Sequence, residues 1–261
     1  MTTPHHIDYP KTALVTGGGK RIGRAIALGL AADGWAVAVH YGGSRIEAEA
    51  VVADIATRGG KAVALHADLA REEQVAGLIG RTVAALGPVG CLVNNASIFE
   101  NELALDVTRD SWDRHLAVNL RAPFVLSQEF ARQLPEDRHG CIVNMLDERV
   151  WSLTPYFFSY TVSKAALWTV TQTLAMALAP RIRVNGIGPG PTLPSPRQTE
   201  AQFQRQESLM PLMRGTTPDE IAAAVKFILT APALTGQMIA LDGGQHLGWA
   251  QMAERNKPPE E

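Results

Sequence analysis

Two residues in the middle of the chain have the spacing of a proton-transfer pair. Tyr160 and Lys164 are four positions apart within a helix predicted at 159–178, so their side chains share one face of it. A free tyrosine has a pKa of about 10, and a neighbouring ammonium lowers it by stabilising the phenolate. The pair can therefore give a proton to an atom that gains negative charge during a reaction.

A glycine-rich turn near the N-terminus predicts a site for phosphate groups. An apolar strand at 12–17 runs into Thr-Gly-Gly-Gly-Lys-Arg-Ile-Gly (16–23), and a helix is predicted at 22–34. Main-chain N–H groups at a helix N-terminus attract phosphate, and glycines allow a close approach to the backbone. The order of strand, turn and helix suits a nucleotide, although the spacing is not that of G-x-G-x-x-G.

Short apolar runs alternate with longer segments of helical periodicity. Strands are predicted at 12–17, 36–41, 61–68, 91–96, 140–145, 181–187 and 237–244. Helices are predicted at 22–34, 45–58, 71–86, 111–134, 159–178 and 217–231. This alternation predicts an α/β fold with a doubly wound, mainly parallel seven-stranded sheet and helices on both faces.

The segments between and beyond these elements suggest one domain over 1–261, with its core at 11–245. No linker or repeat divides the chain. The stretch 191–216 is irregular and rich in proline and glycine, and it follows a strand. A loop of this length inside a domain is typically functional, so we expect a substrate loop there. Residues 254–261 are expected to form a polar tail.

Composition argues against several kinds of partner. The chain has 261 residues, 46% hydrophobic and 19% charged, with a formal net charge of −2. This balance predicts neither a nucleic-acid nor a membrane partner, and no apolar run approaches the ~20 residues that cross a bilayer. Cys91 and Cys141 lie in buried-strand patterns without metal-ligand spacing. We therefore expect no metal and a reducing, cytoplasmic setting.

The motifs together resemble the short-chain dehydrogenase/reductase superfamily. They are TGGGKRIG at 16–23, NNAS at 94–97, Asn119 within VNL, Tyr160-x-x-x-Lys164 and Pro189-Gly190, spanning about residues 11–245. The resemblance implies a Rossmann-type fold, hydride transfer with a nicotinamide cofactor, and a homotetramer. It also implies that Tyr160 donates the proton, that Lys164 holds the nicotinamide ribose, and that Asn119 anchors a water in a proton relay.

The resemblance also implies a set of cofactor contacts. They are Gly17, Lys20, Arg21, Ile22, Gly23, His40, Tyr41, Ser44, Asp68, Leu69, Asn95, Ala96, Ser97, Pro189 and Gly190. Enzymes that use NAD place a carboxylate at the end of the second strand, where it would repel a 2′-phosphate. The segment 39–45 has no acid, which favours NADP(H). The side chains available to hold the extra phosphate are Lys20, Arg21, His40, Ser44 and Arg45.

The position 13 residues before the tyrosine departs from the usual pattern. Most relatives have a serine there that hydrogen-bonds a carbonyl oxygen, whereas this chain has Asp147. An ionised aspartate would repel that oxygen as it gains charge. Asp147 therefore suits a substrate with an N–H group or a protonated ring nitrogen, or it must be protonated itself, which burial favours. Glu148 and Arg149 beside it can form ion pairs that keep it ionised.

This departure resembles the pteridine reductase and dihydromonapterin reductase branch. The shared features are Lys20-Arg21-Ile22-Gly23, His40-Tyr41 with Ser44, Ser97 with Phe99, and Asp147. In that branch an aromatic ring and the nicotinamide enclose the pterin. The implied substrate contacts are Arg21, Ser97, Phe99, Asp147 and Tyr160, and the implied catalytic residues are Tyr160, Lys164, Asp147 and Asn119.

Three functions remain open at this level. The first is NADPH-dependent reduction of a pterin C=N bond. The second is carbonyl or 3-ketoacyl-thioester reduction on the same scaffold, with Asp147 as a passive variant and Phe99 as an ordinary core aromatic. The third is a non-catalytic NADPH-binding sensor, against which the intact Asn119, Tyr160 and Lys164 argue.

Overall fold

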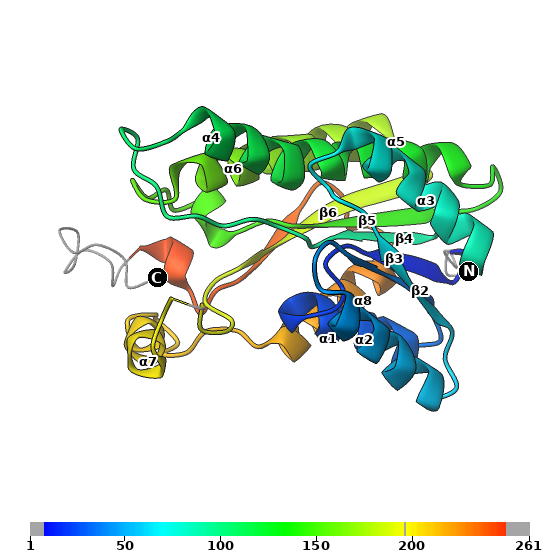
Figure 1. Ribbon diagram of the computed structural model, residues 1–261, viewed down its shortest axis with the longest axis horizontal. Coiled ribbons are helices and arrows are strands. Elements are labelled where there is room, and N and C mark those ends of the chain that lie inside the picture. The colour runs from blue at the N-terminus through cyan, green and yellow to red at the C-terminus, as the bar shows by residue number, and fades with distance from the viewer. Residues whose placement is uncertain (1–7, 196, 249–261) are drawn as a thin grey trace, which may run out of the picture.

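The strands form one parallel sheet with β1 near its centre (Figure 1). The structure, a computed structural model, describes residues 8–195 and 197–248. Within them the strands are β1 (Thr12–Val15), β2 (Ala36–Tyr41), β3 (Ala62–His66), β4 (Cys91–Asn94), β5 (Gly140–Met145), β6 (Ile182–Pro189) and β7 (Met238–Leu241). Their order is β3-β2-β1-β4-β5-β6-β7, and every neighbouring pair is parallel. The central strands are buried on both faces, which explains their continuous apolar runs.

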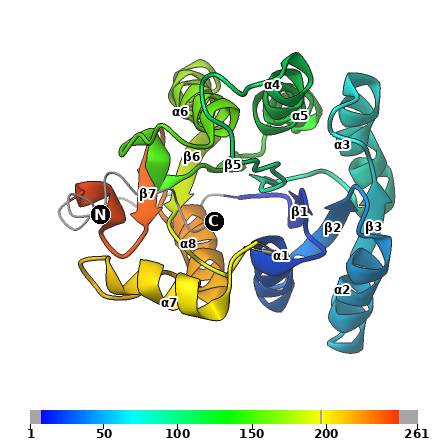
Figure 2. The same cartoon turned by 60° about the vertical axis from the view of Figure 1, so that its left-hand side comes forward.

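Helices cover both faces of the sheet (Figure 1, Figure 2). One layer holds α1 (Arg21–Ala32), α2 (Arg45–Thr57) and α8 (Pro218–Thr230). The other holds α3 (Glu72–Leu86), α4 (Arg109–Leu116), α5 (Ala122–Gln133) and α6 (Phe158–Ala177). Each layer buries its own apolar cluster against the sheet. The doubly wound α/β fold expected from the sequence is therefore confirmed. Across the described ranges, no helix is both long and apolar enough to traverse a membrane.

The helix predicted at 111–134 is interrupted. α4 ends at Leu116, and a short π-helix, η1 (Ala117–Arg121), connects it to α5. The Asn119 side chain, in η1, bonds the main-chain N–H and carbonyl of Ile98. This tertiary contact accompanies the wider turn, and hydrophobic periodicity gives no signal for it.

The sequence predicted an irregular loop at 191–216, but part of this segment is helical. It contains α7 (Glu200–Ser208), which begins with a capping box. The Thr199 hydroxyl accepts from the Gln202 N–H at 3.3 Å, and the Gln202 side chain accepts from the Thr199 N–H at 2.8 Å. The Thr-x-x-Gln signature of such a helix start is present in the sequence. The tail predicted at 254–261 lies outside the described residues.

The carboxyl ends of the central strands bring the candidate site residues to one edge of the sheet. The strand order reverses between β1 and β4, and α/β sheets bind ligands in the crevice at such a point. Gly17 follows β1, Asn95 follows β4, and Asp147 follows β5. Two short turns complete this edge, η2 (Glu148–Val150) after β5 and η3 (Gln245–Leu247) after β7.

Candidate active site

Tyr160 and Asp147 meet in a short hydrogen bond. Tyr160 lies in the first turn of α6, and its Oη donates to Asp147 Oδ2 at 2.7 Å. Both residues are buried, with exposed fractions of 6% and 8%. The carboxylate also caps η2, since its Oδ1 accepts from the Arg149 N–H at 2.9 Å. The residue that replaces the usual serine is therefore bonded directly to the predicted proton donor.

The Lys164 side chain lies close to the ring of Tyr160. Its Nζ donates to the carbonyl of Met145 at 2.7 Å and lies 5.6 Å from the centroid of the Tyr160 ring. Burial lowers the pKa of Lys164 to about 8, and the negative charge of Asp147 opposes that shift. The ammonium is therefore present at neutral pH, close enough to stabilise a phenolate on Tyr160.

The pKa of Lys164 predicts the alkaline side of the activity profile. Below pH 8 the lysine is charged and, in its predicted role, stabilises the phenolate. As the pH rises through about 8 it loses its proton, so we expect kcat/KM to fall, approaching tenfold per pH unit. Steady-state rates from pH 6 to 10 at saturating cofactor test this. A profile that stays level to pH 9.5 would contradict the assignment. The Lys164→Arg variant keeps a positive charge at these pH values, so its residual activity should not fall near pH 8.

Asn119 ties the segment after β4 to α6. Its Oδ1 accepts from Ser97 Oγ at 3.1 Å and from the Ile98 N–H at 2.9 Å. Its Nδ2 donates to the Ile98 carbonyl at 2.9 Å and to Ser163 Oγ at 3.1 Å. All four bonding positions of the amide are therefore filled by protein atoms. The side chain positions Ser97 against the Tyr160 helix, and a role in a proton relay stays a prediction.

The glycine turn has the backbone that the sequence predicts. Gly17 has a positive φ of 62°, and a Cβ on Gly23 would lie only 2.2 Å from the Gly17 carbonyl oxygen. Asn95 holds this turn against the end of β4, because its Nδ2 donates to the Thr16 carbonyl at 2.8 Å. The Thr16 hydroxyl in turn accepts from the N–H groups of Asn95 and Ala96. The N-terminus of α1 is thereby fixed beside the segment that carries Ser97.

His40 supports the turn from below. Its Nδ1 accepts from the Gly17 N–H at 3.1 Å, so the proton is on Nε2, which faces the Ala67 carbonyl at 3.0 Å. The residue is 2% exposed, and burial lowers its pKa to about 4. His40 is thus neutral at pH 7, with both nitrogens occupied. It braces the turn, and the direct phosphate contact expected from the sequence is not open to its imidazole.

The neutral state of His40 predicts a pH-dependent stability. Its folded pKa of about 4 lies below the unfolded value of 6.5, so its contribution is complete above 6.5 and is lost as the pH falls towards 4. The loss should reach roughly 3 kcal/mol of the unfolding free energy. Urea unfolding at pH 7 and pH 4 measures it. His40→Asn keeps an acceptor for Gly17 and should show a smaller difference between the two pH values; an equal difference would exclude His40 as its source.

The charges around the end of β2 are paired. Lys20 Nζ lies 2.6 Å from Glu47 Oε1, and Arg45 Nε lies 2.7 Å from Glu49 Oε1, with all four side chains at the surface. Ser44 is the N-cap residue of α2, and the Tyr41 ring packs on His66 with a centroid distance of 5.4 Å. The segment 39–45 has no acid, but the fold brings Glu47 next to Lys20. The sequence analysis missed this carboxylate.

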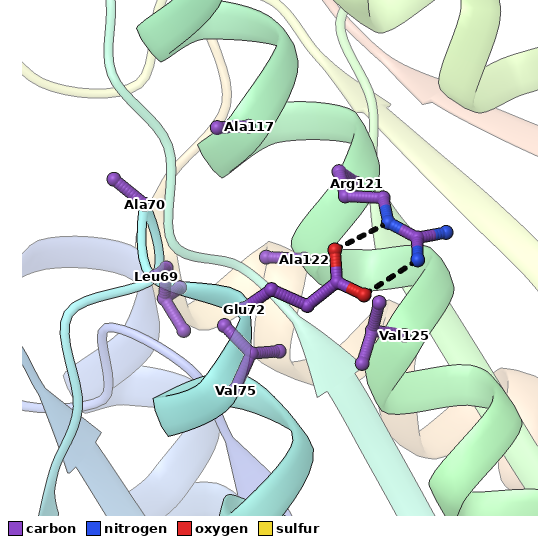
Figure 3. A pocket seen from close by; sticks show the side chains of 8 residues that line it. All are labelled: Leu69, Ala70, Glu72, Val75, Ala117, Arg121, Ala122 and Val125. Carbon is purple, nitrogen blue, oxygen red and sulfur yellow. Dashed lines mark hydrogen bonds and ion pairs between the residues drawn. The ribbon is translucent and has the colours of Figure 1, made fainter.

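Asp68 and Leu69 lie at the end of β3. Asp68 Oδ1 accepts from the Ala70 N–H at 3.0 Å, which shapes the loop. Leu69 lines a cavity of about 100 Å³ with Ala70, Glu72, Val75, Ala117, Arg121, Ala122 and Val125 (Figure 3). A bidentate pair between Arg121 and Glu72 lies beside it, at 2.6 and 2.8 Å. None of the reactive residues Tyr160, Asp147 and Lys164 lines this cavity.

Phe99 forms part of an aromatic shelf beside the tyrosine. Its ring stacks on Phe157 with centroids 4.3 Å apart and planes at 10°, and it meets the Tyr160 ring edge-on at 4.7 Å. Phe157 adopts a left-handed backbone, with φ of 54°, immediately before α6. Phe99 and Tyr160 are therefore brought together as expected, and Phe157 is a member of the shelf that sequence patterns did not reveal.

Arg21 joins the glycine turn to the substrate loop. Its guanidinium donates to the carbonyls of Pro194 and Leu193 at 2.9 and 3.1 Å. At the foot of that loop, the Gly190 N–H donates to the Leu241 carbonyl, and a Cβ on Gly190 would lie 2.8 Å from the Asp242 Cα. Pro189 and Gly190 thus hold the loop's start against β7, at the same edge as the turn.

Glu102 is a further residue that sequence reasoning missed. It is 9% exposed, and its carbonyl accepts from the Phe158 N–H at 3.2 Å, at the start of α6. Its carboxylate accepts from Ser111 Oγ. Burial opposes ionisation, but hydrogen bonding led by Ser111 lowers the pKa of Glu102 below its ordinary value. The loop after Phe99 is thus fixed to the helix that carries Tyr160.

Comparisons with known proteins agree with this geometry. The profile of a family described as enoyl-(acyl carrier protein) reductase matches residues 18–246. The 3-oxoacyl-(acyl-carrier-protein) reductase FabG of Staphylococcus epidermidis is 35% identical over 242 residues, covering 91% of this chain and 99% of the relative.

Solved structures extend the likeness. FolM alternative dihydrofolate reductase 1 from Brucella canis, complexed with NADP, is 50% identical with a TM-score of 0.89, covering 91% of this chain and 94% of that one. A short-chain dehydrogenase from Burkholderia cenocepacia in complex with NADP is 39% identical with a TM-score of 0.82, covering 89% and 96%. The chain, with its paired Tyr160 and Lys164, belongs to the short-chain dehydrogenase/reductase superfamily of oxidoreductases.

Proposed function

We propose that this protein is an NADPH-dependent reductase of a pterin C=N bond. A hydride adds to the imine carbon and a proton to the imine nitrogen, so a dihydropterin becomes a tetrahydropterin and NADPH becomes NADP⁺. The observation that carries the proposal is the bond from Tyr160 to Asp147 at 2.7 Å. A carboxylate at this position accepts from N–H groups and repels a ketone oxygen that gains charge.

The glycine turn supports NADP(H) as the cofactor. A Cβ at Gly23 would collide with Gly17, so the turn requires glycine and leaves main-chain N–H groups for a pyrophosphate. Lys20 is the proposed contact to the 2′-phosphate, and the segment 39–45 at the end of β2 contains no carboxylate that would repel this phosphate. The other proposed contacts are Arg21, Ile22, Tyr41, Ser44, Asp68, Leu69, Asn95, Ala96, Ser97, Pro189 and Gly190, with His40 acting through the turn. When bound, NADPH supplies the hydride to the substrate.

The proton path runs through Tyr160. Its hydroxyl turns from Asp147 to the ring nitrogen and gives up its proton as the imine carbon is reduced. Lys164, 5.6 Å from the ring centroid, stabilises the phenolate that forms. Asp147 orients the hydroxyl beforehand and passes a proton back to the phenolate from solvent. The three side chains therefore divide the work of donation, stabilisation and reprotonation.

The pterin ring would lie against Phe99. One face of the Phe99 ring stacks on Phe157, and this contact fixes the plane of Phe99. A flat heteroaromatic ring suits such an aromatic surface. Asp147 then meets the N–H edge of the pterin, and Ser97, held by its hydrogen bond to Asn119, is a further proposed substrate contact. Arg21 is the proposed substrate contact at the loop. Its guanidinium already binds the loop carbonyls of Leu193 and Pro194.

Carbonyl or 3-ketoacyl-thioester reduction is the second candidate. It is favoured by the name of the Staphylococcus epidermidis relative, at 35% identity. The Tyr160–Lys164 pair serves a ketone equally well, but Asp147 does not. A non-catalytic sensor is disfavoured because a protein that only binds the cofactor has no use for the assembled tyrosine, lysine and carboxylate.

The test compares two substrates under one condition. Purified protein is mixed with NADPH and either dihydrobiopterin or an acetoacetyl thioester, and the loss of NADPH absorbance is followed. We expect a higher kcat/KM with the dihydropterin. Turnover of the thioester alone would overturn the proposal in favour of the second candidate, and cofactor binding without turnover of either would favour the sensor.

We also propose a homotetramer in the cytoplasm. Exposed apolar side chains on two helices, Met176 on α6 and Phe227 on α8, are 74% and 57% exposed in the single chain and suit burial between copies. Sedimentation velocity should give one species of four chains. A monomer at micromolar concentration would contradict this assembly. Reduced, buried Cys91 and Cys141 are compatible with the cytoplasm.

A further inference from the structure

The guanidinium of Arg149 lies across the carboxylate of Asp147. Its Nη1 is 3.3 Å from Oδ1 and 3.4 Å from Oδ2, and the main-chain N–H of the same residue donates to Oδ1 at 2.9 Å. The two side chains are only 14% and 11% exposed. Charge-assisted hydrogen bonds from an arginine are among the stronger ones, and the planar guanidinium gives them a fixed direction. Arg149 therefore fixes the orientation of the Asp147 carboxylate.

Arg149 also contacts the aromatic shelf. Its guanidinium carbon is 5.5 Å from the ring centroid of Phe99 and 5.1 Å from that of Phe157. Both distances lie within the range of about 6 Å in which a cation is attracted to an aromatic ring. One planar group thus touches the proposed stacking ring and the proposed hydrogen-bonding carboxylate.

The two carboxylate oxygens of Asp147 have different hydrogen-bond partners. Oδ1 accepts from the Arg149 main chain, while Oδ2 accepts from Tyr160 at 2.7 Å. The charged or titratable groups near it, among the described residues, are Arg149 with Glu148 beside it on η2, and Tyr160 and Lys164 on α6. Lys164 bonds the Met145 carbonyl, so Arg149 is the cation in direct contact with the carboxylate.

We propose that Arg149 is a positioning and specificity-determining residue that holds the Asp147 carboxylate toward an N–H-bearing ring. The inference rests on the proposed pterin reduction and deepens it. With Arg149 present, the carboxylate has a fixed orientation and the aromatic shelf a fixed place, which match the N–H edge and the face of a pterin. Without Arg149, the carboxylate and the shelf lose a cation that contacts both, so a pterin loses two fixed contacts, whereas a ketone, which needs neither, loses little.

Arg149→Gln tests this inference, since glutamine retains polarity but not charge. We expect kcat/KM for dihydrobiopterin to fall about 30-fold, and kcat/KM for an acetoacetyl thioester to fall less or to rise. Arg149→Lys keeps the charge and should recover part of the loss on dihydrobiopterin, while kcat/KM stays several-fold low because lysine lacks the planar fork.

The controls distinguish a failure of the proposed pterin reduction from a failure of the role proposed for Arg149. Arg132→Gln removes an exposed arginine paired with Glu129 on α5 and should change neither substrate preference nor pH profile. If the unaltered protein does not reduce dihydrobiopterin, the proposed function itself fails. If it does, but Arg149→Gln lowers kcat/KM equally for both substrates, only the role of Arg149 is overturned.

Folding of the variants is checked by NADPH binding and thermal unfolding. If Arg149→Gln does not fold, Arg149→Lys alone decides. A several-fold loss of kcat/KM confined to the pterin supports the proposal. An equal loss on the pterin and the thioester overturns it.

Discussion

Replacing Tyr160 by phenylalanine should lower kcat about 1000-fold on every substrate that the protein reduces. The change removes one oxygen atom, the proton donor, and leaves the ring in its edge-on contact with Phe99. General acid catalysis contributes about 100- to 10,000-fold, and the loss should fall within that range. NADPH binding should remain, because the glycine turn and Lys164 are unchanged. Stopped-flow or steady-state absorbance measures the rate, and fluorescence titration measures the binding.

Tyr156→Phe is the matched control for this change. It removes the same atom from a tyrosine only four positions earlier, outside the hydrogen-bonded group of Tyr160 and Asp147, and should leave kcat within about twofold. If Tyr160→Phe kept most of its activity, the proton would come from another group. Asp147, which lies 2.7 Å from the hydroxyl, would then be the first to examine.

Replacing Asp147 by serine changes the choice of substrate. The substitution restores the residue that most of the superfamily has, a hydroxyl that donates to a ketone oxygen. It removes the carboxylate that accepts from Tyr160 and, in the proposal, from the pterin N–H groups. Losing one or two charge-assisted hydrogen bonds lowers kcat/KM for dihydrobiopterin about 100-fold. Activity on an acetoacetyl thioester should stay level or increase, so the ratio of the two constants is the quantity to measure.

The control for this experiment is Asp54→Ser, at an exposed aspartate paired with Arg24. It should leave both rate constants unchanged. Equal losses with Asp147→Ser on the pterin and the thioester would mean that Asp147 supports the site without selecting the substrate. A preserved pterin preference in that variant would remove the basis for the pterin proposal.

Local spacing predicted the fold and the placement of Tyr160 beside Lys164. Tyr160 and Lys164 are one helical turn apart, so a helix alone brings them together. The need for glycine at Gly23 also follows from the turn itself, because any side chain there would strike the Gly17 carbonyl. The parallel sheet was predictable because both of its faces are buried, which leaves continuous apolar runs in the sequence.

Contacts between distant segments were not predictable in the same way. His40 fits the pattern of a phosphate-binding residue, yet the fold places both of its nitrogens against main-chain atoms. Glu47 lies within α2, outside the strand end that distinguishes the cofactors, but its carboxylate reaches Lys20. Phe157 and Phe99 are far apart in the chain and stack only because the segment after β4 packs against the start of α6. Each of these facts depends on tertiary packing, which sequence periodicity does not encode.

The most direct measurement of the central claim follows one hydrogen atom. NADPH carrying deuterium in both positions of the transferring carbon is incubated with the protein and dihydrobiopterin, and the product is examined by NMR. We expect one deuterium on the former imine carbon of the tetrahydropterin, and a rate that is lost with Tyr160→Phe. Consumption of NADPH without deuterium in the pterin ring, or unlabelled pterin recovered unchanged while a ketone is reduced, would contradict it.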